Sequence, residues 1–162
     1  MRLAPALGLL MLLVLPAHAQ SQGPEPCDIA AVLQCLKRGD TKGGDQKNCL
    51  GVVSGPCLDN DKNNVPDMVR CHDREELAWR DVLNRTVRQL RREMNDEQRK
   101  TLQVMQDAWE TSIKQSCGFY EDYSQGSVAG VLEAACAAEE TARRALFLLF
   151  FIQDPNLVYE GK

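Results

Sequence analysis

The feature that most constrains the fold of this 162-residue chain is the helical spacing of apolar residues in its second half. From Asp73 onward the apolar residues recur at steps of three and four and so share one helix face. They are Trp79, Leu83, Val87, Leu90 and Met94, and arginines fall on the other side. Asn95 and Gln98 then have the spacing of a capping box, which marks a helix start. The pattern therefore predicts one helix ending near Met94 and a second beginning directly after it.

Two more helices follow from the same pattern. The second helix is expected to bury Leu102, Met105, Trp109 and Ile113 and to end near Cys117-Gly118, because glycine suits the left-handed position past a helix end. Residues 119–126 would then be a loop, and Ser127 would cap a third helix that stops at Asp154-Pro155. Its expected inward residues are Val131, Leu132, Ala135, Ala142, Leu146, Leu149 and Phe150. No strand signal of comparable strength is present.

The segment before these helices is interrupted by glycine and proline. Residues 27–37 are predicted to form a short helix that stops at Gly39, residues 38–48 a loop, and residues 50–67 an irregular stretch. We therefore predict an all-α fold in which residues 71–154 form an antiparallel three-helix bundle. A disulfide-tied irregular N-terminal segment, residues 20–70, would pack on it.

The first nineteen residues have the pattern of a secretory signal peptide. Arg2 is followed by an apolar run over residues 3–15, by Pro16, and by the small residues Ala17-His18-Ala19 at the cleavage positions. The run is shorter than the ~20 residues that a bilayer span needs. Gln20, rather than a cysteine for lipid attachment, follows the predicted cut. We expect a secreted or periplasmic mature protein with no membrane anchor.

All seven cysteines lie after the predicted cut, and such density in an oxidising compartment is typical of a disulfide framework. Cys117 and Cys136 bracket the loop between the last two predicted helices, so antiparallel packing would let their sulfurs meet. Closing that loop stabilises by ~3 kcal/mol on the chain-entropy model. A Cys35–Cys49 pair would leave Cys27 either to bridge to another molecule or to stay buried and unreactive.

Charge and composition disfavour several classes of function. Removal of Arg2 with the signal leaves 18 basic and 23 acidic residues, a net charge of −5, with acids mixed among the arginines, which disfavours nucleic acid. His72 is the one histidine after the cut and no CxxC pair occurs, so neither a metal site nor a cofactor is predicted. The stretch from Asp59 begins like a calcium loop but has Asn64 where glycine is needed and Arg70 where glutamate is needed. No nucleophile–base motif is present, so we predict a protein that is not an enzyme.

A set of residues between 71 and 144 resembles the LprI-like lysozyme-inhibitor family of bacterial envelope proteins. The matching residues are Cys71, Trp79, Leu83-Asn84, Gln106-Asp107-Ala108-Trp109, Cys117, Gly126-Ser127, Cys136, Thr141 and Arg143-Arg144. The resemblance implies the pairs Cys57–Cys71 and Cys117–Cys136. It also implies binding to a lysozyme-type muramidase and protection of peptidoglycan.

Two surfaces could serve a partner. The expected loop residues Tyr120, Glu121, Asp122 and Tyr123 combine aromatic rings with negative charge, a composition suited to a cationic lysozyme; the alternative is an ordinary solvated connection. The run from residue 146 to 152 is apolar all round, so it is either covered by the N-terminal segment or an exposed patch. The alternative function is an envelope structural or adaptor module without lysozyme contact, and the sequence leaves the oligomeric state open.

Overall fold

The computed structural model describes residues 23–42, 46–60, 64–124 and 126–161, and all regular structure in these ranges is helical. The elements are α1 (Pro26–Lys42), the 3-10 turn η1 (Gln46–Cys49), α2 (Ser54–Asn60), α3 (Val65–Glu93), α4 (Asp96–Tyr123), α5 (Ala129–Leu149) and α6 (Asn156–Tyr159). The all-α fold predicted from the sequence is confirmed. The expected signal peptide, residues 1–19, lies outside the described ranges.

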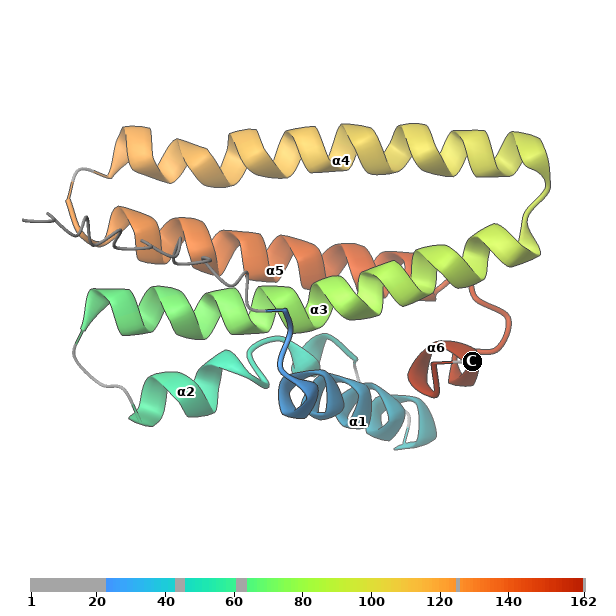
Figure 1. The fold of residues 1–162 in the computed structure, drawn as a ribbon, viewed down its shortest axis with the longest axis horizontal. Coiled ribbons are helices and arrows are strands. Elements are labelled where there is room, and N and C mark those ends of the chain that lie inside the picture. The colour runs from blue at the N-terminus through green and yellow to red at the C-terminus, as the bar shows by residue number, and fades with distance from the viewer. Residues whose placement is uncertain (1–22, 43–45, 61–63, 125, 162) are drawn as a thin grey trace, which may run out of the picture.

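The three long helices α3, α4 and α5 form the bundle (Figure 1). α5 packs on both α3 and α4, and the short elements α1, α2 and α6 pack on α3. Figure 1 shows α4 along one edge of the molecule and α1, α2 and α6 along the opposite edge. α5 therefore provides most of the packing that holds α4 against the rest of the fold.

The core lies between α3, α5 and the N-terminal elements. Its largest fully buried side chains include Trp79, Leu36 and Leu148, which come from three different helices. α4 contributes little, because only Leu102, Ile113 and Cys117 are buried along its 28 residues. Most of the surface of this long edge helix is consequently in contact with water.

The N-terminal segment is more regular than the sequence predicted. α1 continues through Gly39, and α2 forms where residues 50–67 were expected to be irregular. α3 begins at Val65 instead of near Asp73, with Asn64 as its N-cap and Pro66 in its first turn. A proline in a first helical turn removes an N–H that has no helical partner anyway, so it marks a helix start here and not an interruption.

The end of α4 also differs from its prediction. The helix passes through Gly118 and ends at Tyr123, and the turn glycine is Gly126, whose φ of 112° lies in the left-handed region. α5 then begins at Ala129 without a side-chain cap from Ser127, and it ends at Leu149, before the expected stop at Asp154-Pro155. Glycine can adopt the left-handed conformation that follows many helices, but its presence does not by itself end a helix. For this reason Gly118 does not mark the end of α4.

The apolar run after residue 145 is partly covered and partly exposed. Leu148, Leu149 and Ile152 are buried, whereas Phe147, Phe150 and Phe151 are exposed, so each of the two alternatives holds for part of the run. The expectation that Phe150 and Leu132 point inward was wrong, because α5 is covered on two sides only. None of the helices in the described ranges is both long enough and apolar enough to span a membrane.

Candidate functional site

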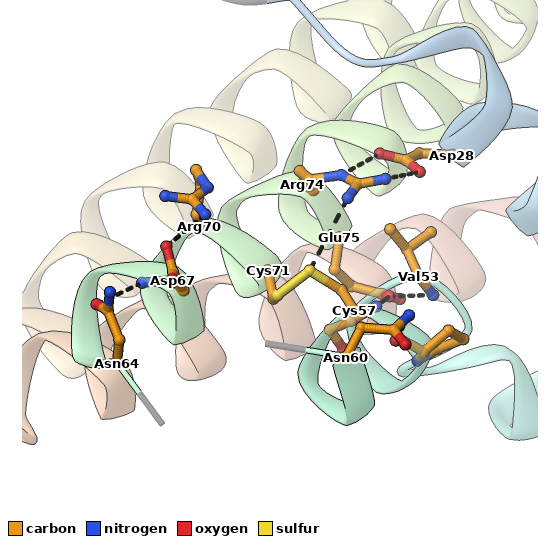
Figure 2. The surroundings of a disulfide bond; sticks show 12 residues. Asp28, Val53, Cys57, Asn60, Asn64, Asp67, Arg70, Cys71, Arg74 and Glu75 are labelled. Carbon is orange, nitrogen blue, oxygen red and sulfur yellow. Dashed lines mark hydrogen bonds and ion pairs between the residues drawn. A yellow bond between two sulfur atoms is a disulfide. The ribbon is translucent and has the colours of Figure 1, made fainter. Parts of the chain in front are cut away.

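The N-terminal segment is fastened to α3 around the Cys57–Cys71 disulfide, which joins α2 to α3 (Figure 2). The neighbouring Arg74 donates two hydrogen bonds to Asp28 of α1, at 2.9 and 2.7 Å. The hydrogen bond to Asp28 raises the pKa of the Arg74 guanidinium. α1 and α2 are thereby held against the same two turns of α3.

Glu75 is the buried centre of this junction. Its carboxylate accepts hydrogen bonds from the backbone N–H groups of Val53 and Ser54, at 2.7 and 2.8 Å, and from that of Gly51 at 3.1 Å. It also accepts one from the indole Nε1 of Trp79, at 2.6 Å. One carboxylate thus satisfies the free donors at the start of α2 and fixes the ring of the largest core residue.

The other cysteines form two further disulfides and leave one thiol. Cys35–Cys49 joins α1 to η1, and Cys117–Cys136 joins α4 to α5. Cys57–Cys71 and Cys117–Cys136 are the pairs that the resemblance implied, whereas the sequence left the pairing of Cys27, Cys35 and Cys49 open. Cys27 is an exposed free thiol whose Sγ lies 3.7 Å from an oxygen of Asp28.

A stack of cations on an aromatic ring joins the three bundle helices. The guanidinium groups of Arg80 of α3 and Arg144 of α5 lie 5.3 and 5.8 Å from the centroid of the Trp109 ring of α4. Arg80 forms ion pairs with Glu76 and Glu110. The half-buried Trp109 side chain therefore packs against the apolar core and also contacts a layer of charged side chains.

Arg144 completes this layer from α5. Its Nε donates to the Oε1 of Gln106 at 2.7 Å, and its buried Nη2 has no hydrogen-bond partner among the described residues. Burial lowers the pKa of Arg144. Gln106, Trp109 and Arg144, which the family resemblance rests on, are thus brought together by the fold, and Thr141 joins them through its 3.3 Å hydrogen bond to Glu76.

The aromatic and acidic residues proposed for partner binding lie on the last turns of α4, not in a loop. Phe119, Tyr120 and Tyr123 are exposed, to 59, 37 and 77%, respectively. The rings of Phe119 and Tyr123 stack with centroids 6.0 Å apart. Since Tyr123 follows both other rings by one helical turn, the three share a face, while Glu121 and Asp122 point to other sides of the exposed helix end.

The structure adds two acidic residues to this end of the molecule. The pKa of Glu133 of α5 is raised, first by burial and then by the charges of Glu121 and Asp73. The pKa of Asp73 is raised by burial and by Glu76, against a smaller opposing effect of His72. Glu133 lies one turn from Cys136, so the register of the Cys117–Cys136 disulfide was the sequence signal that could have found it.

We call this surface the acidic-aromatic end: Phe119, Tyr120, Glu121, Asp122, Tyr123 and Glu133. Val128 and Leu132, which are also exposed, extend its apolar part onto the start of α5. Figure 1 shows that the α4–α5 connection lies at one extremity of the bundle. The Cys117–Cys136 disulfide holds the two helices together immediately behind it.

Comparison with known protein families decides the family of this chain. The model of a family described as "Lysozyme inhibitor LprI" matches residues 57–148, more than half of the chain. The chain belongs to the LprI family. The matched LprI region begins at Cys57, earlier than the sequence resemblance indicated, and contains both the Cys57–Cys71 and the Cys117–Cys136 disulfides. Searches of curated proteins and of solved structures gave no match.

The description of the LprI family is that of a lysozyme inhibitor. Burial lowers the pKa of His72, against smaller opposing effects of Glu75 and Asp73. Within the described ranges, no group of three or more His, Cys, Asp or Glu residues is placed to hold a metal ion. Residues 61–63 of the candidate calcium loop lie outside those ranges.

Proposed function

We propose that this LprI protein is a periplasmic or secreted inhibitor that binds a lysozyme-type muramidase and so protects peptidoglycan. The observation that carries the proposal is the acidic-aromatic end, where exposed rings and carboxylates are held by a disulfide at one extremity of the bundle. C-type lysozymes are strongly cationic, and complementary charge increases the rate and the specificity of association.

The two kinds of side chain have separate roles in this proposal. The rings of Phe119, Tyr120 and Tyr123 are large and have few rotatable bonds, so they lose little entropy when they are buried by a partner. Glu121, Asp122 and Glu133 steer the approach of a cationic protein. Docking of a helical hairpin over the muramidase cleft would exclude the glycan chain.

The test is inhibition of a C-type lysozyme by the oxidised mature protein, together with measured binding kinetics. The double substitution Phe119→Ser with Tyr123→Ser is expected to weaken binding at least tenfold, mainly through faster dissociation, because aromatic anchors dominate interface energies. The double substitution Glu121→Gln with Asp122→Asn is expected to slow association and to flatten its dependence on salt.

A matched control distinguishes a loss of binding at the proposed site from a loss caused by the change in net charge. Glu97→Gln with Asp107→Asn makes the same change of charge on exposed positions of α4 away from the acidic-aromatic end. Full inhibition by this control, with loss in the two end variants, supports the proposed site. Equal losses in control and end variants would place the site elsewhere, and a wild-type protein that inhibits no lysozyme would overturn the function.

An envelope adaptor without lysozyme contact is the alternative function. It is favoured by one observation, the exposure of three phenylalanines at the other end of α5. The inhibition assay distinguishes the two functions, because an adaptor of this kind would leave muramidase activity unchanged.

A further inference from the structure

The C-terminal end of α5 carries a cluster of exposed aromatic rings that the acidic-aromatic end does not use. Phe147, Phe150 and Phe151 form this phenylalanine face, and Phe150 is 85% exposed. The ring of Phe151 touches the other two edge-on, with centroids 5.2 and 5.6 Å away. Contiguous exposed rings of this kind mark an interaction surface on a soluble protein.

An apolar groove opens directly beside these rings. It has a cavity volume of about 380 Å³ and lies between the end of α3, the start of α4 and the end of α5. Phe151 belongs to both the groove and the phenylalanine face, and most of the remaining lining is apolar: Leu90, Met94, Leu102, Met105 and Leu148. Since a cavity of about 150 Å³ accepts benzene, this groove has room for a phenyl ring.

We propose that the groove receives Phe150 from a second copy of this chain, which places its own groove around the Phe150 of the first. A two-fold interface uses the same patch on both copies and therefore needs a projection and a recess on one surface. Phe150 is the projection. The groove is the recess, and the ring of Phe151 lies between it and Phe150. The side chains involved are those of a homodimer interface core, which is apolar and rich in aromatic residues and methionine.

The charges around the groove favour a second copy over other partners. The turn between α3 and α4, which lines one end of the groove through Met94, Asn95, Glu97 and Gln98, interleaves both signs, with Arg91, Arg92, Arg99 and Lys100 among Glu93, Asp96 and Glu97. A patch that meets itself needs such a balance, because an excess of one sign would repel its own copy. An anionic lipid surface attracts a basic patch, and a cationic protein attracts an acidic one, so this mixed rim suits neither.

The dimer would leave the proposed lysozyme site free. α5 has 21 residues, so its two ends are about 30 Å apart. Figure 1 shows the α4–α5 connection at the opposite extremity from the α3–α4 turn, whose residues line the groove. The two copies would present their acidic-aromatic ends outward. Dimer formation is therefore independent of the proposed inhibitory function, and either can fail without the other.

Sedimentation velocity of the oxidised mature protein over a concentration series tests the proposal. The measurement uses the Cys27→Ser background, so that association through the free thiol does not contribute. We expect a reversible monomer–dimer equilibrium whose dissociation constant increases at least about tenfold on Phe150→Ala, because the ring is the proposed central anchor. Tyr123→Ala, which removes an almost equally exposed ring at the other end, is expected to leave the equilibrium unchanged.

A mixing experiment tests the reciprocal geometry. Met105→Trp fills the groove but keeps the projecting ring, and Phe150→Ala keeps the groove but removes the ring. Neither variant can form a contact with itself, whereas a mixed pair retains one of the two contacts. We expect stronger association in the mixture than in either variant alone.

Three results would overturn the proposal. These are a wild-type protein that stays monomeric throughout the series, a mixture that associates no better than its components, and a monomer that binds anionic phospholipid vesicles in a Phe150-dependent way. Circular dichroism of each variant confirms that the helices are intact before its association is measured.

Discussion

At the scale of single residues, Glu75 couples the N-terminal segment to the bundle. Glu75→Ala would leave three backbone N–H groups and the Trp79 indole without their acceptor. We expect a loss of about 3 kcal/mol in the free energy of unfolding, because buried donors without partners are costly. Glu75→Gln keeps one carbonyl oxygen but turns an amide toward these donors, so its loss should be smaller.

Urea denaturation of both Glu75 variants measures this loss. Glu97→Gln is the control, because Glu97 is exposed at the start of α4 and its substitution should change the stability by less than about 0.5 kcal/mol. If Glu75→Ala were no more destabilising than this control, the junction would be held by the disulfides and not by the carboxylate.

The sequence predicted only part of these residue roles. The adjacent residues Glu75 and Glu76 have different surroundings, because Glu75 faces α2 while Glu76 pairs with Arg80. The three backbone N–H partners of Glu75 lie 21 to 24 positions away in the chain, and no local pattern encodes contacts of that range. Trp109 sits on the apolar stripe of α4, but two arginines from other helices decide its polar surroundings.

At the scale of elements, local rules predicted the turn between α3 and α4 but neither the start of α3 nor the end of α4. The capping box of Asn95 and Gln98 forms as expected, because its hydrogen bonds depend only on residues three positions apart. The end of α4 was misplaced at Gly118, since its last turns are held against α5 by the Cys117–Cys136 bond. That tertiary constraint also explains why the proposed binding residues lie on a helix although they were expected in a loop.

The same disulfide should control the order of the acidic-aromatic end. The double substitution Cys117→Ser with Cys136→Ser is expected to lower the free energy of unfolding by about 3 kcal/mol on the chain-entropy model. Since few residues of α4 are buried, the last turns up to Tyr123 should open locally and weaken lysozyme binding along with stability.

Amide hydrogen exchange resolved along α4 measures this local opening. Protection should decrease most between Ile113 and Tyr123 and least near Leu102, which is anchored in the core. The double substitution Cys35→Ser with Cys49→Ser removes a bond at the other side of the molecule and is the matched control. A uniform loss of protection along α4 would show that the helix opens as one unit, contrary to this expectation.

At the scale of the whole molecule, the two extremities of the bundle differ in chemistry. One carries carboxylates and exposed rings, and the other carries phenylalanines within a rim of mixed charge. The composition of the chain predicted an acidic protein but not this separation, because it arises from the antiparallel order of α4 and α5. The separation allows charge-steered binding at one end and apolar association at the other.

The raised pKa of Glu133 should make lysozyme binding at the acidic-aromatic end sensitive to pH. Burial and the charges of Glu121 and Asp73 raise the pKa of Glu133 above its ordinary value of 4.5. A cationic partner favours the charged carboxylate, so binding should weaken as the pH falls through this raised pKa. Titration of the dissociation constant against pH measures the effect.

Glu133→Gln separates binding from stability at the same position. A raised folded-state pKa means that protonation of Glu133 stabilises the fold at pH values below the unfolded pKa, and that this contribution is lost as the pH rises through the folded pKa. At neutral pH the charged carboxylate therefore opposes folding, and Glu133→Gln should raise the stability while it slows association with lysozyme and flattens the pH profile. If the substitution lowered the stability at neutral pH, the charged Glu133 would stabilise the fold, contrary to the proposed role in binding a cationic partner.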